Sequence, residues 1–249
     1  TFQNYYSHYF KKFKIHKKTI KEGNLLDLLA FRKAKKIIFT SDWAKRSCIR
    51  YYGIDKNKIE ILPFGSNLKN KYLEKRINNN IIKKSKKKNF SFISVGIDWE
   101  RKGMAFSCKL IKKLNELGIN AKLTIIGPKK IPDKFKRLRY IKFISFLDKN
   151  NSKNIDVIQQ NFFNSHFHLL FSKAEAFGVV FAEANSLGLF NFCFDVGGVS
   201  GAIKNDKNGY KFKKNASVTY VAKILRSKYL KKKNYIKYSK SSYYFQQKN

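Results

Sequence analysis

Two acidic residues eight positions apart, Glu175 and Glu183, are the side chains whose types and spacing best suit ligand chemistry. They flank the start of a predicted helix that opens at Gly178, shortly after the apolar run 168–171. The first N–H groups of a helix have no partner within it, and the helix dipole adds partial positive charge there, so this end stabilises a phosphate. A carboxylate further along, such as Glu183, can accept hydrogen bonds from sugar hydroxyls. Together these features predict a nucleotide-diphosphate ligand, although the bare spacing more often belongs to an ordinary amphipathic helix.

A second turn with suitable residues, 96–103, joins another predicted strand to its following helix. Gly96 ends the strand, and Arg101 and Lys102 precede Gly103. Lysine supplies a compact charge and arginine a bidentate fork, so this turn suits a diphosphate. In a chain so rich in lysine, a charged surface loop with a glycine cap explains the same pattern equally well.

The segment 175–183, with the sequence Asn-Ser-Leu-Gly at 185–188, resembles the E-x7-E signature of family 4 retaining glycosyltransferases. The Lys-Gly pair at 102–103, the segments 40–43 and 61–67, and the loop 195–199 also match stretches of that family. The resemblance covers roughly residues 25–215. It implies the GT-B fold, in which two Rossmann-like domains face a cleft, and a reaction that needs no metal or other cofactor.

The resemblance also implies roles for individual residues. Glu175 would face the donor sugar and Lys102 the donor phosphates, and we expect these two to be the catalytic residues. Glu183 would bind the ribose. The other donor-binding residues that the resemblance implies are Gly96, Arg101, Gly103, Phe146, Leu147, Phe177, Gly178, Val179 and Val180. It also implies that the backbone near residues 146–148 meets the nucleobase, although an ordinary loop after a strand explains that stretch equally well. The family more often carries an arginine directly after the first glycine, where this chain has Ile97, and Arg101 is the candidate substitute.

Apolar runs separated by turn residues predict an α/β fold, because strands and helices alternate from residue 90 to residue 194. Such alternation calls for a parallel sheet with helices on both faces. Residues 1–23 show no clear period, and we expect loops and at most a short helix there. The predicted strands are 36–40, 59–62, 90–95, 121–126, 140–144, 167–171 and 190–194, and the predicted helices are 25–34, 41–52, 104–117, 155–163, 178–187 and 217–226.

We predict four parts along the chain. Residues 1–67 would be a remnant of the N-terminal, acceptor-side domain, and 68–88 a linker with an approach helix but no usable hydrophobic period. Residues 89–230 would form the nucleotide-sugar donor-binding domain, followed by a basic, helical tail over 231–249. The first residue is not methionine and the glycine-rich loop of the family's first domain has no match before Gly65, so we expect a fragment that lacks most of the acceptor side.

The net charge of +38 over 249 residues allows binding to nucleic acid or to an anionic membrane surface. The abundance of Lys, Asn, Ile, Phe and Tyr, all encoded by A/T-rich codons, explains the charge without a partner. Because the lysines are spread along the chain, we expect no specific nucleic-acid partner. The three cysteines are widely spaced and odd in number and show no pattern of a disulfide framework, which suits a reducing cytoplasm. His166 and His168 have no evident further metal ligands, so we expect packing or surface roles for both.

The predicted function is retaining transfer of a sugar from a UDP- or GDP-sugar to a hydroxyl of a lipid-linked or saccharide acceptor, in glycan, lipopolysaccharide or polysaccharide biosynthesis. The expected location is the cytoplasm or the inner face of the membrane, whose anionic surface would be a further partner. The alternative is a binding module that holds a nucleotide sugar or a membrane surface without transfer.

Overall fold

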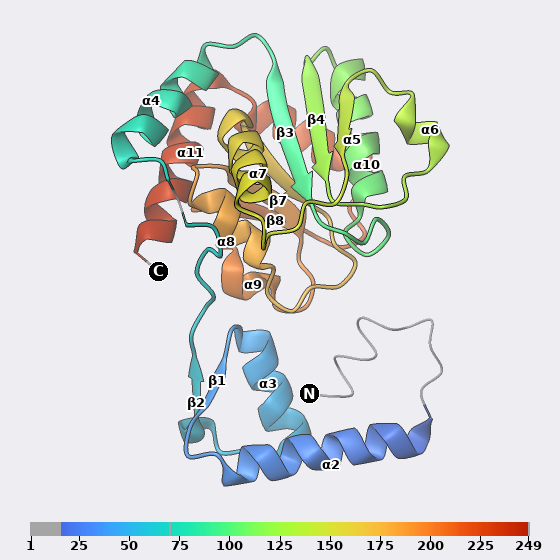
Figure 1. The fold of residues 1–249 in the computed structure, drawn as a ribbon, viewed down its shortest axis with the longest axis vertical. Helices are drawn as coiled ribbons and strands as arrows, with labels where there is room; N and C mark the ends of the chain where they lie inside the picture. The colour runs from blue at the N-terminus through green and yellow to red at the C-terminus, as the bar shows by residue number, and fades with distance from the viewer. Residues whose placement is uncertain (1–15, 70, 249) are drawn as a thin grey trace. The chain divides into compact units, whose positions relative to one another are not determined.

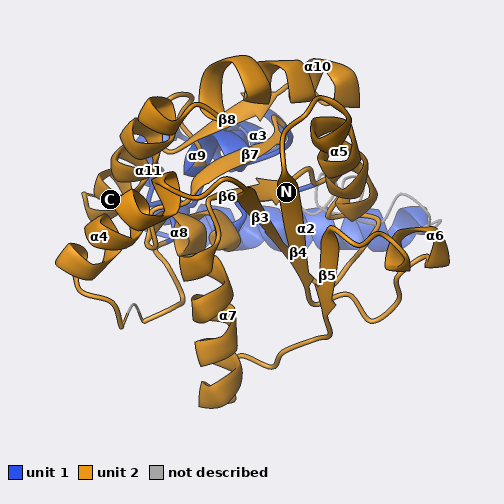
Figure 2. Ribbon diagram, turned by 90° about the horizontal axis from the view of Figure 1, so that it is seen from above, with its two compact units in different colours: residues 1–64, 174–178, 196–202 blue, residues 65–173, 179–195, 203–249 orange. Residues whose placement is uncertain are grey.

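The computed structural model describes residues 16–69 and 71–248 (Figure 1). By their contacts these residues form two compact units, coloured separately in Figure 2. Unit 1 contains the described residues up to Phe64 together with segments 174–178 and 196–202. Unit 2 contains segments 65–173, 179–195 and 203–249 apart from the residues not described. The predicted boundary at residue 67 lies near the division at 64, but the two short segments assigned to unit 1 were not foreseen.

Unit 1 is built on two short parallel strands, β1 (Ile37–Phe39) and β2 (Ile59–Ile61). Helix α2 (Lys17–Lys33) precedes them, and α3 (Asp42–Tyr52) and the 3-10 turn η1 (Lys56–Lys58) connect them. A small core of Ile37, Cys48, Ile54 and Ile59 lies between these elements. The helix predicted over 25–34 therefore begins eight residues earlier, at Lys17, and includes residues 17–23, where we expected loops and at most a short helix. Residues 1–15, including His8, lie outside the described part.

The helix predicted over 41–52 is confirmed as α3, and capping residues bound it at both ends. The Ser41 hydroxyl accepts a hydrogen bond from the Ala44 N–H at 3.4 Å, which satisfies one of the unpaired donors at the helix start. The helix ends at Gly53, whose φ of +61° lies in the left-handed region that glycine adopts without steric cost.

Unit 2 is organised around a parallel sheet of six strands in the order β5-β4-β3-β6-β7-β8. The strands are β3 (Phe90–Val95), β4 (Ala121–Ile126), β5 (Ile141–Ile144), β6 (Phe167–Leu170), β7 (Phe190–Phe194) and β8 (Gly209–Phe212). The predicted α/β class with a parallel sheet is confirmed. The sixth strand, β8, was not predicted, because Gly-Tyr-Lys-Phe has neither a long apolar run nor a clear alternation.

Helices cover both faces of this sheet (Figure 2). The helix α5 (Met104–Glu116) packs with α10 (Val218–Ile224). The helix α11 (Lys232–Gln247) packs with α4 (Glu74–Ser85) and with α8 (Val179–Asn185). The helix α4 also packs with α7 (Ser152–Asn164). The short helices α6 (Asp133–Lys136) and α9 (Val199–Ala202), the latter in unit 1, were not predicted. In the part of the chain that the structure describes, no helix combines the length and apolar composition needed to cross a membrane.

Aromatic side chains fill the centre of unit 2. The rings of Phe167 and Phe192 have centroids 5.4 Å apart, and Phe92 stacks on Phe167 at 5.5 Å. All three side chains are fully buried. Full burial of one such side chain stabilises a fold by roughly 1.5–3 kcal/mol, so these central strands are well anchored beneath the loops that follow them.

The segment 68–88, expected to lack an apolar face, contains one in α4. Ile77 and Ile81, one helical turn apart, are buried in unit 2. Lys84, a further turn on, is also fully buried, and its ammonium donates hydrogen bonds to the carbonyls of Ser165 and Phe163 at 2.5 and 3.1 Å. The expectation of no hydrophobic period was wrong because two isoleucines among lysines and asparagines give only a weak periodic signal.

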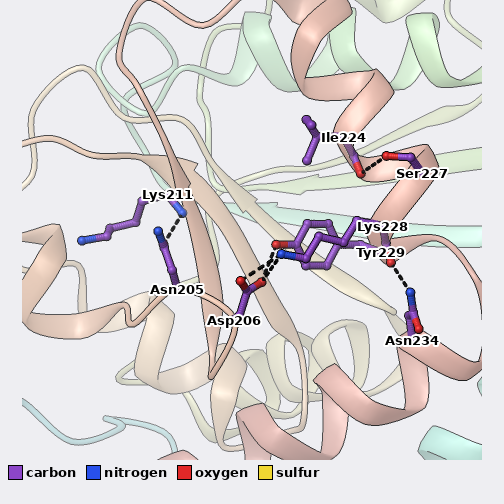
Figure 3. Close-up of polar contacts among 8 residues, drawn as sticks. All are labelled: Asn205, Asp206, Lys211, Ile224, Ser227, Lys228, Tyr229 and Asn234. Carbon is purple, nitrogen blue, oxygen red and sulfur yellow. Dashed lines mark hydrogen bonds and ion pairs between the residues drawn. The ribbon is translucent and has the colours of Figure 1, made fainter.

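The C-terminal segment 231–249, expected to be a helical tail, holds α11, which buries Tyr235, Tyr238 and Tyr243. It is preceded by a π-helical turn, η2 (Leu225–Tyr229), which Asp206 anchors to the loop before β8 (Figure 3). The Asp206 carboxylate accepts hydrogen bonds from the Tyr229 hydroxyl at 2.7 Å and the Lys228 ammonium at 2.9 Å. Burial by itself would raise the pKa of Asp206, but these hydrogen bonds bring it below its usual range.

The buried ammonium group of Lys84 should make the free energy of unfolding depend on pH. Burial, together with the smaller effect of the Lys87 charge, lowers the pKa of Lys84 from 10.5 to about 7. Between these two pH values the unfolded chain binds a proton that the folded chain releases, so this residue makes stability rise with pH. In urea unfolding from pH 7 to pH 10, the stability of the wild type relative to Lys84→Met should rise by about 1.4 kcal/mol per pH unit.

Lys83 is the matched control for this test, since it is exposed on the same turn of α4. The Lys83→Met variant should keep the pH dependence of the wild type. A Lys84→Met variant with the same dependence as the wild type would show that Lys84 carries its charge equally in both states.

Candidate functional site

The turn from β3 to α5 is folded tightly by its own residues. The Asp98 carboxylate accepts a hydrogen bond from the Arg101 N–H at 2.9 Å, and the Asp98 carbonyl accepts one from the Lys102 N–H at 2.9 Å. The aliphatic part of the Lys102 side chain lies against Gly96. A Cβ added at Gly96 would lie only 2.8 Å from the Lys102 Cγ. The absence of a side chain at Gly96 therefore allows Lys102 to lie across the end of β3.

Gly103 has a packing role that needs no ligand. Its φ is +65°, and an added Cβ would lie 1.9 Å from the carbonyl oxygen of Phe171, so only glycine fits. Two residues further along that loop, the Lys173 N–H donates a 2.7 Å hydrogen bond to the Arg101 carbonyl. The turn after β3 and the loop after β6 are thus joined by a close approach and by a hydrogen bond.

This junction lies where the sheet changes its direction of winding. The chain proceeds from β3 outward through β4 to β5, and then returns to β6 beside β3 before continuing to β7 and β8 on the other side. Loops that leave two such central strands diverge to opposite faces of the sheet, and the crevice between them is the usual ligand site of an open α/β sheet. The structure therefore brings the predicted residues Gly96, Arg101, Lys102 and Gly103 to the switch point.

Arg101, the candidate substitute for the family arginine, has interactions of its own. Its Nε lies 3.6 Å from a carboxylate oxygen of Asp98, and its side chain is 26% exposed. The guanidinium is therefore partly accessible and could turn toward an anion, but it already has a partner on the same turn.

The predicted residues Glu175, Phe177 and Gly178 belong to unit 1 by their contacts. Glu175 is buried, and its carbonyl accepts a hydrogen bond from the Gly198 N–H at 2.9 Å. The ring of Phe177 packs edge-on against Phe64, with centroids 5.5 Å apart. Gly178 has a φ of +87°, a conformation that favours glycine directly before α8.

Close packing explains the glycine at position 198 of the loop 195–199. A Cβ at Gly198 would lie 1.6 Å from the carbonyl oxygen of Ala176, so the loop segments 174–178 and 196–202 approach each other at backbone distance. This packing requirement accounts for Gly198 without any contact to a ligand.

Glu183 lies within α8 of unit 2 and is almost completely buried, with 1% of its side chain exposed. Its Oε1 accepts a hydrogen bond from the Lys149 ammonium at 2.5 Å, while its Oε2 has no hydrogen-bond partner among the described residues. Burial of a charge is costly without compensation, and Lys149 supplies the counter-charge. Sequence reasoning missed Lys149, although it directly follows the predicted base-contacting region.

Phe146 and Leu147, predicted to contact the nucleobase, follow β5 two strands away from β3 in the sheet. The Phe146 side chain is 44% exposed and Leu147 is partly buried. Exposed apolar groups beside Lys149 are compatible with contact to a planar base. Val179 and Val180, the first residues of α8, are partly exposed. The helix is shorter than the predicted 178–187, because it ends at Asn185.

The two histidines of the β6 region have the expected packing roles. His166 Nδ1 accepts a hydrogen bond from the Ser91 N–H at 3.0 Å, so Nε2 carries the proton and donates to the Lys84 carbonyl at 3.0 Å. His168 Nδ1 donates to the Asn191 side chain at 2.7 Å. Burial lowers the pKa of His166 to about 3 and that of His168 to about 4, so both are neutral at physiological pH. Within the described residues, no three His, Cys, Asp or Glu side chains gather where a metal ion could be held.

Comparisons with solved structures give the same architecture. WaaG, described as a glycosyltransferase involved in lipopolysaccharide biosynthesis, matches with a TM-score of 0.67 and 19% identity, covering 86% of this chain and 59% of that one. A glycosyltransferase from Rickettsia africae matches with a TM-score of 0.66 and 19% identity over 95% and 64% of the two chains. Anabaena Alr3699/HepE, in complex with UDP and glucose, matches with a TM-score of 0.67 and 15% identity, covering 94% of this chain and 63% of that one. The chain thus spans about three fifths of the length of these structures.

The sequence comparisons add the family. No curated protein matches this chain in sequence. The model of the family "glycosyl transferases group 1" matches residues 75–242, two thirds of the chain, and the match includes both the turn 96–103 and the segment 175–183. This chain therefore belongs to the glycosyl transferases group 1 family, and it has the parallel-sheet α/β fold of GT-B glycosyltransferase structures.

Proposed function

We propose that this chain binds a nucleotide-diphosphate sugar, with UDP- and GDP-sugars as the first candidates, and takes part in retaining transfer of the sugar to a hydroxyl acceptor. The observation that carries the proposal is the junction at the switch point. There the close approach of Gly103 to Phe171 fixes a lysine-bearing turn beside the loop that leads into α8. The family membership and the UDP bound to Alr3699/HepE support the choice of ligand.

In this proposal each group acts on one part of the donor. Lys102 neutralises the diphosphate, and the amides of residues 177–180 donate hydrogen bonds to it. Glu183 accepts hydrogen bonds from the ribose, while Glu175 faces the sugar. Since α8 has only seven residues, we assign most of the charge stabilisation to Lys102 rather than to the helix dipole.

The chemical contribution would be mainly electrostatic. As the bond between the sugar and the diphosphate breaks, negative charge grows on the leaving diphosphate. Positive groups and N–H donors that are already in place stabilise that charge without reorganisation. Transfer also requires an acceptor hydroxyl held in register with the donor, which can supply about 7–11 kcal/mol of the barrier. We propose a lipid-linked or saccharide hydroxyl as the acceptor.

A second candidate function is donor binding without transfer. It is favoured by the small size of unit 1, whose described residues contain one two-stranded sheet, β1 and β2. Release of free nucleotide in the presence of saccharide and lipid acceptors separates the two candidates, since a binding module would retain the nucleotide sugar intact.

The role of Lys102 is tested by substitution. Lys102→Ala should weaken UDP binding by about 1.5–3 kcal/mol, the usual range for a hydrogen bond to a charged group, as measured by calorimetry. The control is Lys109→Ala, since Lys109 is exposed on α5, the helix that follows Lys102 in the chain. An affinity that falls equally in both variants would reflect only the general positive charge, and an unchanged affinity in Lys102→Ala would refute the assignment.

The role of Glu183 is tested by comparing two ligands. If Glu183 accepts the ribose hydroxyls, Glu183→Ala should lower the affinity for UDP by about 1.5–3 kcal/mol and leave the affinity for pyrophosphate almost unchanged. Thermal unfolding of the variant should first show that the fold is retained. Equal losses for UDP and pyrophosphate would mean that Glu183 supports the structure of the site rather than contacting ribose.

A further inference from the structure

The ion pair between Lys149 and Glu183 joins a buried group to an accessible one. The carboxylate side chain is 1% exposed, whereas the lysine side chain is 43% exposed, and the two charged atoms lie 2.5 Å apart. The lysine therefore occupies the carboxylate from its solvent-accessible side. Any hydroxyl that approaches Glu183 from solvent has to compete with this ammonium group.

The pairing leaves the carboxylate only half satisfied. Lys149 bonds to Oε1, and Oε2 is buried without a hydrogen-bond partner in the described part of the chain. A buried acceptor without a donor is costly, so the ligand-free arrangement is not the best one available to Glu183. A vicinal diol carries two hydroxyl donors and can supply one to each oxygen.

The lysine can leave without disturbing its loop. Asp148 fixes the backbone on either side of it, since its carboxylate accepts a hydrogen bond from the Asn150 N–H at 2.9 Å and its carbonyl accepts one from the Asn151 N–H at 3.2 Å. Asn151 in turn caps α7. The lysine side chain has a flexible four-carbon stem and a strongly hydrated head, so it can turn into water while the backbone stays in place.

We propose that Lys149 tunes the selectivity of the donor site for ribose, because it competes with the ribose diol for the carboxylate of Glu183. In the free chain Lys149 neutralises Glu183. When a ribonucleotide binds, the two hydroxyls replace the ammonium on the carboxylate and satisfy both oxygens. The inference rests on the proposed function, in which Glu183 contacts ribose, and it adds a residue that opposes that contact.

The expected effect of removing Lys149 follows from this competition. Without the ammonium, Glu183 has a partner only when a diol is bound. The diol then contributes more to the free energy of binding, because it no longer has to displace Lys149. Loss of a positive charge also weakens the binding of any anion, but it weakens UDP and 2′,3′-dideoxy-UDP alike. The ratio of the two affinities therefore isolates the competition from the general charge effect.

The experiment measures the Kd of UDP and of 2′,3′-dideoxy-UDP by calorimetry for the full chain and its variants. Lys149→Met should increase the preference for UDP over the dideoxy form by about three- to tenfold, in the range of one lost hydrogen bond. Lys149→Arg should lower this preference below that of the wild type, because a guanidinium can bond to both carboxylate oxygens and is harder to displace. The control Lys153→Met removes an exposed charge at the start of α7 and should leave the preference unchanged.

The other outcomes are equally informative. A preference that is unchanged or reduced in Lys149→Met would overturn the competition, the reduced case indicating that Lys149 holds Glu183 in place for the ribose. If Lys149→Met fails to fold, the charged Lys149→Arg variant still decides the question by the direction of its change. If the wild-type chain binds both nucleotides equally, Glu183 does not contact the ribose, and this proposal is wrong. Failure of the wild type to bind any nucleotide or nucleotide sugar would overturn the proposed function itself.

Discussion

The close approach of Gly103 to the Phe171 carbonyl is the constraint on which the candidate site depends. At this point the start of α5 and the end of β6 come together at a distance that excludes any side chain, and the hydrogen bond from Lys173 to Arg101 reinforces the contact. Strands β3 and β6 lie side by side beneath it, with fully buried aromatic residues on both. Because the core fixes the strands, it also fixes the two loops that emerge from them, and Lys102 is presented from a rigid base.

Lysine performs different tasks in different surroundings of this strongly basic chain. Lys84 is buried and links α4 to the end of α7 through two carbonyl groups. Lys149 neutralises a buried carboxylate from the surface, and Lys102 lies across a glycine at the switch point. Part of the positive charge of this chain therefore has a role in its local structure.

The sequence predicted the central strands and most helices of the fold because their signals are local. Runs such as 90–95 and 121–126 coincide with β3 and β4, and Ser41 and Gly53 bound α3 as capping residues should. Features that depend on tertiary contacts were missed. The apolar face of α4 consists of two isoleucines whose burial is set by neighbouring helices, and β8 is recognisable as a strand only through its pairing with β7.

The candidate site likewise combines residues that local sequence signals reveal with contacts that only the tertiary structure reveals. The glycines and basic residues of the turn 96–103 could be found from their types and spacing, but the reason for Gly103 could not, because Phe171 is distant in sequence. The pairing of Lys149 with Glu183 likewise joins residues 34 positions apart, and no local pattern indicates it.

Hydrogen–deuterium exchange with and without saturating UDP tests most directly whether the turn after β3 and the segment leading into α8 form one donor site. The account predicts slower exchange in peptides that cover residues 96–103 and 175–183, and no change in peptides from α3 or α10. Protection confined to other segments, or protection of only one of these two, would contradict a single nucleotide-diphosphate site at the switch point.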